Sequence, residues 1–337
     1  MRVLVTGGAG YIGSHTAKFL HRQGLAPVVL DDLSTGHREF VRYGPFEQGD
    51  VRDEARVLDV LKRHAIDAVV HFAAKALVAE SMRIPETYFS VNVGGMVSLL
   101  GAMKRAGVRR LVFSSSCAVY GTAHGEEIPE DQALAPVNPY GLSKLQAEQA
   151  IETIGPSFGL RWAVLRYFNV VGADPEGELF EWHEPETHVL PNLINAALEG
   201  REFHLYGNRY PTADGTAIRD YVDVGDLART HAEALAALDH QERIVSNVGR
   251  GEGVSVRQLV AAVERATTKP VLVRIEPPRA GDPARLVADS RHLRTWSLGA
   301  RQGFTPLDES IRNVLQAQRN KPGGPPPHPV ATGRKRE

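Results

Sequence analysis

Two side chains that could handle a proton together lie four residues apart in the segment NPYGLSK, where Tyr140 supplies a phenol and Lys144 an ammonium group. Asn138 is a favoured N-cap residue and Pro139 suits the first helical position, so we predict that a helix begins here. Residues four apart share one helix face, and both a neighbouring cation and a helix N-terminus favour the phenolate. We therefore expect Tyr140 to have a lowered pKa and to act as a general base. The alternative is a solvated lysine beside a half-buried tyrosine, because this spacing is common by chance.

A partner motif stands at the start of the chain, where VLVTGGAGYIGSH places Gly7, Gly10 and Gly13 at intervals of three residues. The glycines directly follow a β-branched strand and open a helix, which is the setting of a dinucleotide-binding loop. They allow a tight turn and a close backbone approach to a pyrophosphate, and the helix N-terminus stabilises its charge. The sequence therefore predicts a nucleotide cofactor.

Acidic residues end the next two strands. Asp31 and Asp32 follow the second strand, where a carboxylate can accept hydrogen bonds from adenosine ribose hydroxyls and would repel a 2′-phosphate, so NAD is favoured over NADP. His37 and Arg38 follow closely and weaken that preference. Asp50, after the third strand, could accept from the adenine amino group or could simply be a turn aspartate.

Apolar runs alternate with helical patterns in the first half of the chain. The strand candidates are RVLVTG, PVVLDD, DAVVHFAA, RRLVFSSS and AVLRYFN, and the helix candidates are 12–22, 54–64 and 91–105. Such runs indicate a parallel sheet covered on both faces. We predict an α/β protein with a Rossmann-type, doubly wound parallel sheet and a smaller, mixed α/β C-terminal substrate domain.

The domain boundaries are predicted from the change of pattern near residue 170. Residues 1–170 form the NAD-binding domain, and a later strand at 244–249 returns to it. Residues 171–320 mainly form the substrate domain, with helices expected at 224–238 and 254–267. The Pro/Gly-rich, basic tail 321–337 is expected to be disordered.

Composition excludes several classes of protein. A formal net charge of −1 over 337 residues gives no argument for nucleic acid or an anionic membrane as a partner. The single cysteine, Cys117, cannot form an internal disulfide and indicates a reducing compartment. No signal peptide or membrane span is recognisable, so a cytoplasmic protein is expected.

Seven segments together resemble the extended short-chain dehydrogenase/reductase superfamily and, within its NAD-dependent epimerase/dehydratase members, the UDP-glucose (UDP-galactose) 4-epimerase family. In chain order they are GGAGYIGSH, HFAAKALVAES, SSSCAVYG, NPYGLSK, LRYFNVVGA, YPTADGTAIRDYVDVGDLA and PRAGDPARLVAD. The resemblance covers essentially residues 1–320. It implies tightly bound NAD, a UDP-sugar substrate and inversion of the sugar at C4 through a transient 4-keto sugar.

The resemblance also assigns roles. Ser116, Tyr140 and Lys144 would be catalytic, and they would contact the cofactor and, for Ser116 and Tyr140, the sugar 4-hydroxyl. The cofactor-binding residues would further comprise Gly7, Gly10, Tyr11, Ile12, Gly13, Asp31, Asp32, Leu33, Ser34, Thr35, Gly36, Asp50, Val51, Phe72, Ala73, Ala74, Asn92 and Phe168. The substrate-binding residues would further comprise Asn169, His188, Val189, Leu205, Tyr206, Arg219, Arg279 and Asp282. No metal site is predicted.

The chain departs from the family pattern at a few positions. Some members carry Asn-Leu at the place of His188 and Val189, and a cofactor-contacting lysine where this chain has Ala76, one residue after Lys75. Leu286 is intermediate between the tyrosine of strict enzymes and the smaller residue of those that accept N-acetylated sugars.

Two related reactions are separated by residues that follow Ser116. Nucleotide-sugar 4,6-dehydratases commonly carry Asp-Glu where this chain has Cys117 and Ala118, and neither of these can serve the elimination. The alternatives that remain are a 4-epimerase of another UDP-sugar (N-acetylhexosamine, pentose or glucuronate) and, least favoured, a noncatalytic NAD-binding protein.

A homodimer is expected, because family members pair two helices per subunit, including the one that carries Tyr140. Leu145, Ala147 and Ala150 make that helix partly apolar.

Overall fold

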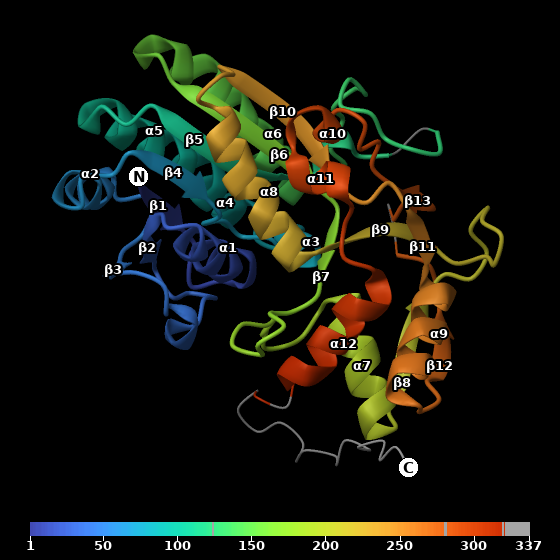
Figure 1. Ribbon diagram of the computed structural model, residues 1–337. Helices are drawn as coiled ribbons and strands as arrows, with labels where there is room; N and C mark the ends of the chain where they lie inside the picture. The colour runs from blue at the N-terminus through green and yellow to red at the C-terminus, as the bar shows by residue number, and fades with distance from the viewer. Residues whose placement is uncertain (123–124, 280–281, 319, 321–337) are drawn as a thin grey trace.

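The computed structural model describes residues 1–122, 125–279, 282–318 and 320. The tail 321–337, for which disorder is predicted, lies outside the described residues. Figure 1 shows a sheet with its covering helices at the upper left and a second group of elements at the lower right.

A seven-stranded parallel sheet is the centre of the molecule, with strand order β10-β6-β5-β4-β1-β2-β3. The strands are β1 (Arg2–Thr6), β2 (Ala26–Asp31), β3 (Phe46–Gln48), β4 (Ala68–His71), β5 (Arg110–Ser116), β6 (Arg161–Tyr167) and β10 (Arg243–Val248). The interior of these strands is almost continuously buried, which is expected of a parallel sheet covered on both faces. The predicted strands are confirmed, including the late strand, which pairs with β6.

Helices cover the two faces of this sheet and bury alternate residues of each strand. On one face, α2 (Glu54–Arg63), α5 (Gly95–Ala106) and α6 (Pro139–Ile154) pack over residues such as Leu4 and Val69. On the other face, α1 (Tyr11–Arg22) and α8 (Val224–Ala237) pack over residues such as Val3 and Val5. The alternation follows from the two-residue period of a strand.

One predicted helix begins differently. In place of a continuous helix from residue 91, a π-helical segment, Phe89–Gly94, precedes α5. Its Asn92 side chain bonds the backbone N–H and carbonyl of Lys75 and the hydroxyl of Ser143. The π-helical hydrogen-bond pattern thus occurs where Asn92 holds the segment that follows β4. The periodicity of apolar residues in the sequence does not reveal this local change of helix type. Short helices α3 (Val78–Ser81) and α4 (Pro85–Tyr88) in the same region were also not predicted.

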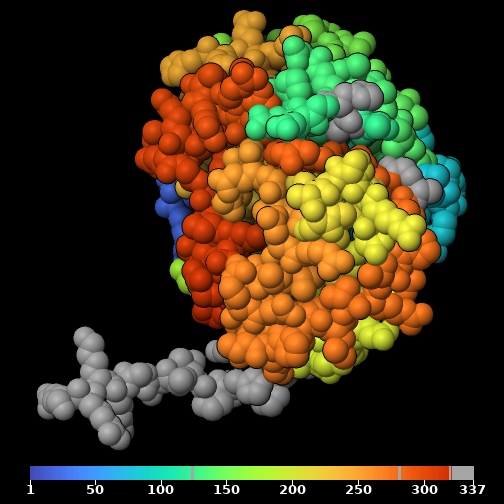
Figure 2. All heavy atoms as spheres, turned by 90° about the vertical axis from the view of Figure 1, so that its right-hand side faces the viewer, coloured from blue at the N-terminus to red at the C-terminus, as the bar shows by residue number. Residues whose placement is uncertain are grey.

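The later part of the chain forms a separate core beside the carboxyl ends of the strands. Its strands are β7 (Asn169–Val171), β9 (Ile218–Asp223), β11 (Gly253–Ser255) and β13 (Arg285–Leu286) in one small sheet, and β8 (Glu202–Tyr206) and β12 (Leu272–Glu276) in another. The main helices are α7 (Val189–Glu199), α9 (Val256–Thr267) and α12 (Leu307–Gln318). Residues of β7, β8, β9, α7, α9 and α12 share one apolar cluster, whereas β12 is mostly exposed and Leu286 of β13 packs on another cluster. Figure 2 shows this part of the chain from its outer side, where yellow and orange segments form most of the face.

Shorter helical turns connect these elements. They are α10 (Leu293–Trp296), α11 (Leu298–Gln302) and the 3₁₀ turns Arg38–Phe40, Cys117–Tyr120 and Gly155–Phe158. Among the residues that the structure describes, no helix has the length and apolar character needed to cross a membrane.

Candidate active site

The glycine loop joins β1 to α1 in the way the sequence predicts. Gly7 has φ +70°, and a Cβ atom there would lie 2.5 Å from the backbone nitrogen of Ala73. A Cβ on Gly13 would lie 2.2 Å from the carbonyl oxygen of Gly7. Gly10 is the N-cap of α1, no side chain caps the helix, and its first turn has no acidic residue. The N–H groups at this helix end are therefore free to bind an anion such as a pyrophosphate.

The carboxylate at the end of β2 is fixed by the backbone around it. Asp31 is 7% exposed and accepts hydrogen bonds from the N–H groups of Ala9 (2.9 Å) and Leu33 (2.8 Å). Burial raises the pKa of its carboxyl group, while these two hydrogen bonds oppose that shift. Asp32 is exposed and accepts from the N–H of Ser34. Asp31 thus holds the loop in place, and a carboxylate has acceptor positions to spare for ribose hydroxyls.

The two basic residues beyond Asp32 are engaged elsewhere. The ring of His37 stacks on Trp182 with a centroid distance of 4.0 Å, and its Nε2 lies 2.9 Å from the Trp182 carbonyl oxygen. The guanidinium of Arg38 lies over the Phe46 ring, 4.5 Å from its centroid. Both side chains thus have partners within the protein.

Asp50 has a partner that the sequence reasoning missed. Arg52 Nε lies 2.9 and 3.0 Å from the two carboxylate oxygens of Asp50, and its Nη1 donates to the Ser90 hydroxyl. The Arg52 hydrogen bond is the main cause that lowers the pKa of Asp50. The D-x-R spacing was a visible signal for this pair. The predicted adenine contact of Asp50 stays a prediction.

The predicted base and its lysine lie on α6, as the spacing requires. The Asn138 side chain caps the helix by accepting from the N–H of Gly141 at 2.8 Å, which confirms the predicted helix start. Tyr140 is in the first turn and Lys144 in the second, and both are almost fully buried. Ser116 is the last residue of β5 and lies next to them in the same cavity.

Electrostatics in this centre differ from the expectation. Burial raises the pKa of Tyr140 to about 12, and a hydrogen bond with Ser116 only partly opposes the shift. Burial also lowers the pKa of Lys144 to about 7. Its Nζ donates to the carbonyl oxygen of Ser114 at 2.8 Å. The predicted lowering of the Tyr140 pKa by Lys144 is therefore wrong for the protein alone, because removal of the phenol from water outweighs the hydrogen bond with Ser116, and Lys144 is not among the groups that shift this pKa.

A buried polar network holds α6 against the sheet. Arg166 on β6 forms a buried ion pair with Glu148 on α6, with Nη2 and Oε2 2.6 Å apart. The same guanidinium donates to the Tyr120 hydroxyl, and the Ser115 hydroxyl donates to Glu148. This network fixes the helix that carries Tyr140 relative to the strand that carries Ser116.

Most predicted site residues line one cavity of about 440 Å³ at the carboxyl ends of the strands. These are Gly7, Gly10, Tyr11, Ile12, Gly13, Asp31, Asp32, Ser34, Thr35, Gly36, Asp50, Val51, Phe72, Ala73, Ala74, Ser116, Tyr140, Lys144, Phe168, Asn169, His188 and Val189. Residues that the sequence reasoning missed also line it, among them Arg52, Tyr167, Glu181, Trp182 and His183. A hollow of about 810 Å³ lies at the opposite ends of β5, β6 and β10 and contains none of the predicted site residues.

The remaining predicted residues lie outside the lining of this cavity: Leu33, Asn92, Leu205, Tyr206, Arg219, Arg279 and Asp282. Leu205 is 2% exposed in the core of the later part of the chain, so its side chain packs rather than faces a ligand. Asn92 uses its side chain to hold Lys75 and Ser143.

Four of these outlying residues form two pairs. Arg219 Nη2 lies 2.5 Å from Asp282 Oδ1, and the Arg279 guanidinium lies 4.1 Å from the centroid of the Tyr206 ring. The charge of Arg219 lowers the pKa of the thiol of Cys117, the residue that follows Ser116, although burial raises that pKa more strongly. An arginine paired with a carboxylate and another on an aromatic face both offer forked N–H donors that suit phosphate.

The start of α7 carries a polar cluster at the wall of the cavity. His188, the N-cap of α7, has Nδ1 2.7 Å from Glu181 Oε1 and 3.5 Å from Glu186 Oε1. Burial alone would lower the pKa of His188, but the two carboxylates raise it to about 10. His183 completes this cluster, which lies beside the predicted substrate contact Val189.

Comparison with known proteins agrees with this geometry. A model of the NAD dependent epimerase/dehydratase family matches residues 3–249. The chain belongs to this family.

Individual relatives extend the likeness over nearly the whole chain. A UDP-glucose 4-epimerase of Rhizobium meliloti (strain 1021) is 46% identical over 294 residues, 87% of this chain and 90% of the relative. A crystal structure of UDP-glucose 4-epimerase from Brucella ovis in complex with NAD has 45% identity and a TM-score of 0.88, covering 94% of this chain and 98% of that one. An epimerase structure from Stenotrophomonas maltophila, with bound NAD and formylated UDP-arabinopyranose, has 39% identity and a TM-score of 0.90 over 95% and 98% of the two chains.

Within this epimerase/dehydratase family, the residues after Ser116 bear on the reaction. Burial raises the pKa of the Cys117 thiol to about 12, so it holds its proton at neutral pH, and Ala118 has no ionisable group. Neither residue can supply the acid or base that an elimination needs.

The positions at which the chain departs from the family pattern lie near the same cavity. Lys75 and Ala76 both line it. Leu286 is half-buried and packs against the cluster that contains Phe168.

Proposed function

We propose that the protein interconverts UDP-galactose and UDP-glucose by inverting the configuration at C4 through a transient 4-keto sugar. The observation that carries this proposal is the meeting of Ser116, Tyr140 and Lys144 in a cavity that also contains the glycine loop. The names of the relatives agree with it. Cys117 and Ala118 leave epimerisation as the outcome that the local chemistry supports.

The residues of the cavity fit NAD. The uncapped N-terminus of α1, with Tyr11 and Ile12 in its first turn, would hold the pyrophosphate, and Asp31 would hold the ribose hydroxyls. Lys144 would bind the second ribose. NAD⁺, when bound, would supply the acceptor for the C4 hydride (the hydrogen with its electron pair) and the donor for its return, and its positive charge would favour the phenolate of Tyr140.

The proton steps belong to Tyr140 and Ser116. Tyr140, as phenolate, takes the proton of the 4-hydroxyl while the C4–H bond breaks, which leaves a 4-keto sugar. Ser116 hydrogen-bonds the same oxygen and carries part of its changing charge. When hydrogen returns to the other face of C4, Tyr140 gives the proton back. No net proton, oxidant or reductant is consumed.

Inversion requires that the sugar turn while the nucleotide stays in place. Arg219 and Arg279 would anchor the diphosphate through charge-assisted bonds, with Asn169 at the cavity wall. Tyr206 and Asp282 would contact the uridine. A 4-keto sugar held mainly through its diphosphate can then present its opposite face.

The test is an incubation of the NAD-loaded protein with UDP-galactose and no added oxidant. We expect UDP-glucose to accumulate until the two sugars reach equilibrium, measured by chromatography. If no UDP-glucose forms, the proposed function fails.

A second candidate is 4-epimerisation of another UDP-sugar, favoured by Leu286 near the Phe168 cluster. A relative has been solved with a formylated UDP-arabinopyranose, although that ligand is a property of that protein. A panel that offers UDP-N-acetylglucosamine, UDP-xylose and UDP-glucuronate in competition with UDP-glucose separates these substrates by their kcat/KM values.

We also propose a homodimer formed through α5 and α6. The apolar residues named from the sequence face inward, since Ala147 is fully buried and Leu145 and Ala150 pack on core clusters. The exposed apolar side chains on these helices are instead Val97 on α5 and Leu142 on α6, which are 46% and 38% exposed. A second copy that covers them would also brace the helix of Tyr140.

A further inference from the structure

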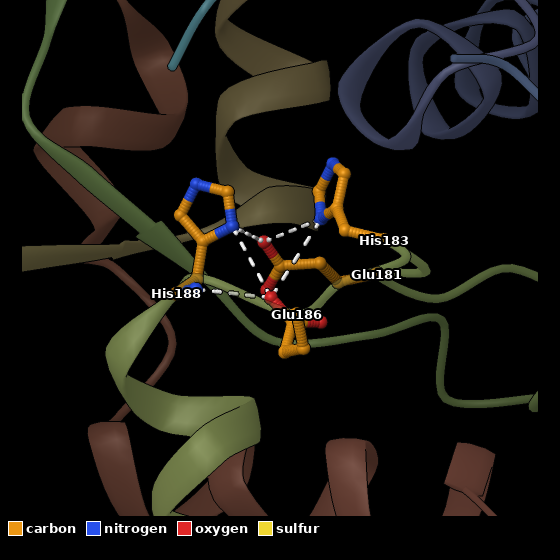
Figure 3. Close-up of side chains that lie close together, drawn as sticks. All are labelled: Glu181, His183, Glu186 and His188. Atoms are coloured by element: carbon orange, nitrogen blue, oxygen red, sulfur yellow. Dashed lines mark hydrogen bonds and ion pairs between the residues drawn. The ribbon is translucent and has the colours of Figure 1, made fainter. Parts of the chain in front are cut away.

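A group of four side chains of metal-ligand type lies in the loop that leads into α7, at the wall of the cavity but apart from Ser116 and Tyr140. It consists of Glu181, His183, Glu186 and His188, and we name it the loop cluster. Each residue offers one ligand atom, and these atoms all lie within 4.8 Å of one another. Figure 3 shows the two imidazole rings on either side of the two carboxylates, with the Nδ1 atoms turned toward them.

The distances between these atoms suit a tetrahedral ion. His183 Nδ1 lies 3.5 Å from Glu181 Oε1 and 3.8 Å from Glu186 Oε1, and His188 Nδ1 lies 2.7 and 3.5 Å from the same two oxygens. Zinc with bonds of roughly 2.0–2.2 Å in tetrahedral geometry separates its ligands by roughly 3.4 Å. Three of the four separations are already close to this value, and the His188–Glu181 pair would open by a fraction of an ångström.

Some buried polar atoms of the loop cluster have no hydrogen-bond partner. The side chains of Glu181 and Glu186 are 6% and 10% exposed, and their ion-pair partners within the described residues are His183 and His188, with no lysine or arginine. His183 Nδ1 and Glu186 Oε2 are buried without a hydrogen-bond partner. His188 brings one positive charge to the two carboxylates, so what is left without a partner is one buried ring nitrogen and one buried carboxylate oxygen, and a divalent cation bound here would offset that cost.

A second acidic group serves as a contrast. Asp174, Glu176 and Glu178 also lie close together, but Lys18 Nζ is 2.8 Å from an oxygen of each. That group has its counter-ion built in, whereas the loop cluster has no such lysine among the described residues.

We propose that the loop cluster binds one Zn²⁺ ion through Nδ1 of His183 and His188 and one carboxylate oxygen each of Glu181 and Glu186. Two imidazoles and two carboxylates form a donor set that zinc prefers over magnesium or calcium, which prefer all-oxygen sites. The ion would cross-link residues 181–188 just before α7 and would cancel negative charge at the wall of a cavity that admits phosphates. The inference goes beyond the proposed function, since no step of the epimerisation uses the ion.

Zinc binding can be measured on the NAD-loaded protein, prepared without a histidine tag and dialysed against EDTA. Titration with Zn²⁺ against a chromophoric chelator, together with elemental analysis, is expected to give one tightly held ion per chain. His183→Gln should weaken this binding at least tenfold, and Glu178→Gln, in the contrast group, should leave it unchanged. Co²⁺ in place of zinc should give the intense visible absorption of a tetrahedral site in the wild type and lose it in His183→Gln.

The result that overturns the proposal is a wild-type protein that retains no stoichiometric zinc, or a His183→Gln variant that binds it equally well. Circular dichroism and NAD content establish that the variant is folded. If it is not, His188→Gln and the cobalt spectrum of the wild type decide the question. Because the readout is metal binding, its failure is distinct from a failure to convert UDP-galactose.

Discussion

Single residues of the catalytic centre are controlled more by burial than by neighbouring charge. Tyr140 has its pKa raised to about 12, and Lys144 has its pKa lowered to about 7, in both cases first by desolvation. Above about pH 7, the protein without cofactor therefore holds Tyr140 as a neutral phenol and Lys144 as a neutral amine. The phenolate that the chemistry requires must be favoured by positive charge that arrives with the cofactor.

Replacement of the base tests its role. We expect Tyr140→Phe to keep its bound NAD and to lose about 10²- to 10⁴-fold in kcat, the range for a positioned acid or base. Tyr88→Phe is the matched control, since Tyr88 lies 6.4 Å from Tyr140 between ring centroids but bonds Leu77 and Glu80. Steady-state rates and cofactor content of both variants give the comparison. A Tyr140→Phe variant with full activity would rule out the mechanism.

Some residues of the site could be predicted from the sequence and others could not. The glycine loop, Asp31 and the Tyr140 helix could be predicted, because local rules of turns, caps and spacing govern them. The loop cluster and the Arg52 partner of Asp50 were missed. Burial decides the pKa values of Tyr140 and Lys144, and burial is a property of the folded chain that no local pattern contains.

At the scale of elements, the position of α6 decides whether Tyr140 meets Ser116. The buried Glu148–Arg166 pair joins this helix to β6, and the Ser115 hydroxyl adds a bond from β5. Sequence analysis predicted the helix but not its attachment, because nothing in the pattern shows that Glu148 pairs with Arg166 on the next strand of the sheet.

Breaking this attachment should destabilise the protein. Glu148→Gln leaves the buried Arg166 without its charge partner, so we expect a loss of about 3–5 kcal/mol in the free energy of unfolding. Glu152→Gln, on an exposed turn of the same helix, should change it by less than about 0.5 kcal/mol. Denaturant unfolding followed by circular dichroism measures both. Equal midpoints for the two variants would show that the pair does not hold α6.

For the whole molecule, we infer that residues 1–170 together with β10 form the cofactor unit and that residues 171–320 mainly form the substrate unit. The parallel sheet was predictable from its apolar runs, and the strand 243–248 was recognisable although it follows the later elements. The pairing of β8 with β12 and the small sheet around β9 could not be predicted, because their strands are short and far apart in the chain.

Three buried histidines predict how stability depends on pH. Burial lowers the pKa of His15 and His231 to about 4 and that of His71 to about 3. In the unfolded chain these imidazoles take up protons below about pH 6.5, whereas in the folded chain they stay neutral. The free energy of unfolding therefore decreases as pH falls from 6.5 toward 4. Asp223, with its pKa raised to about 6, works in the opposite direction.

Comparison of the wild type with a His71 variant isolates the contribution of one histidine to the pH dependence of stability. His71→Asn keeps a partner for the Thr6 hydroxyl, which bonds His71 Nδ1, but cannot titrate. Its free energy of unfolding should fall less steeply between pH 6.5 and pH 4 than that of the wild type, by up to about 1.4 kcal/mol per pH unit. Parallel curves would contradict a neutral, buried His71.

Assembly is tested on the exposed helix face. Leu142→Glu places a charge where the second copy is expected, so light scattering should show a dimer for the wild type and a monomer for the variant. Glu152→Gln, ten residues further along α6, should remain dimeric. A monomeric wild type would refute the dimer.

The central claim is that hydrogen leaves C4 and returns to the same carbon from the other side. The most direct measurement uses UDP-galactose deuterated at C4, incubated in ordinary water with the NAD-loaded protein and analysed by mass spectrometry and NMR. We predict UDP-glucose that retains its deuterium at C4. Formation of UDP-glucose with the deuterium exchanged for solvent hydrogen, or the absence of any conversion, would contradict the account.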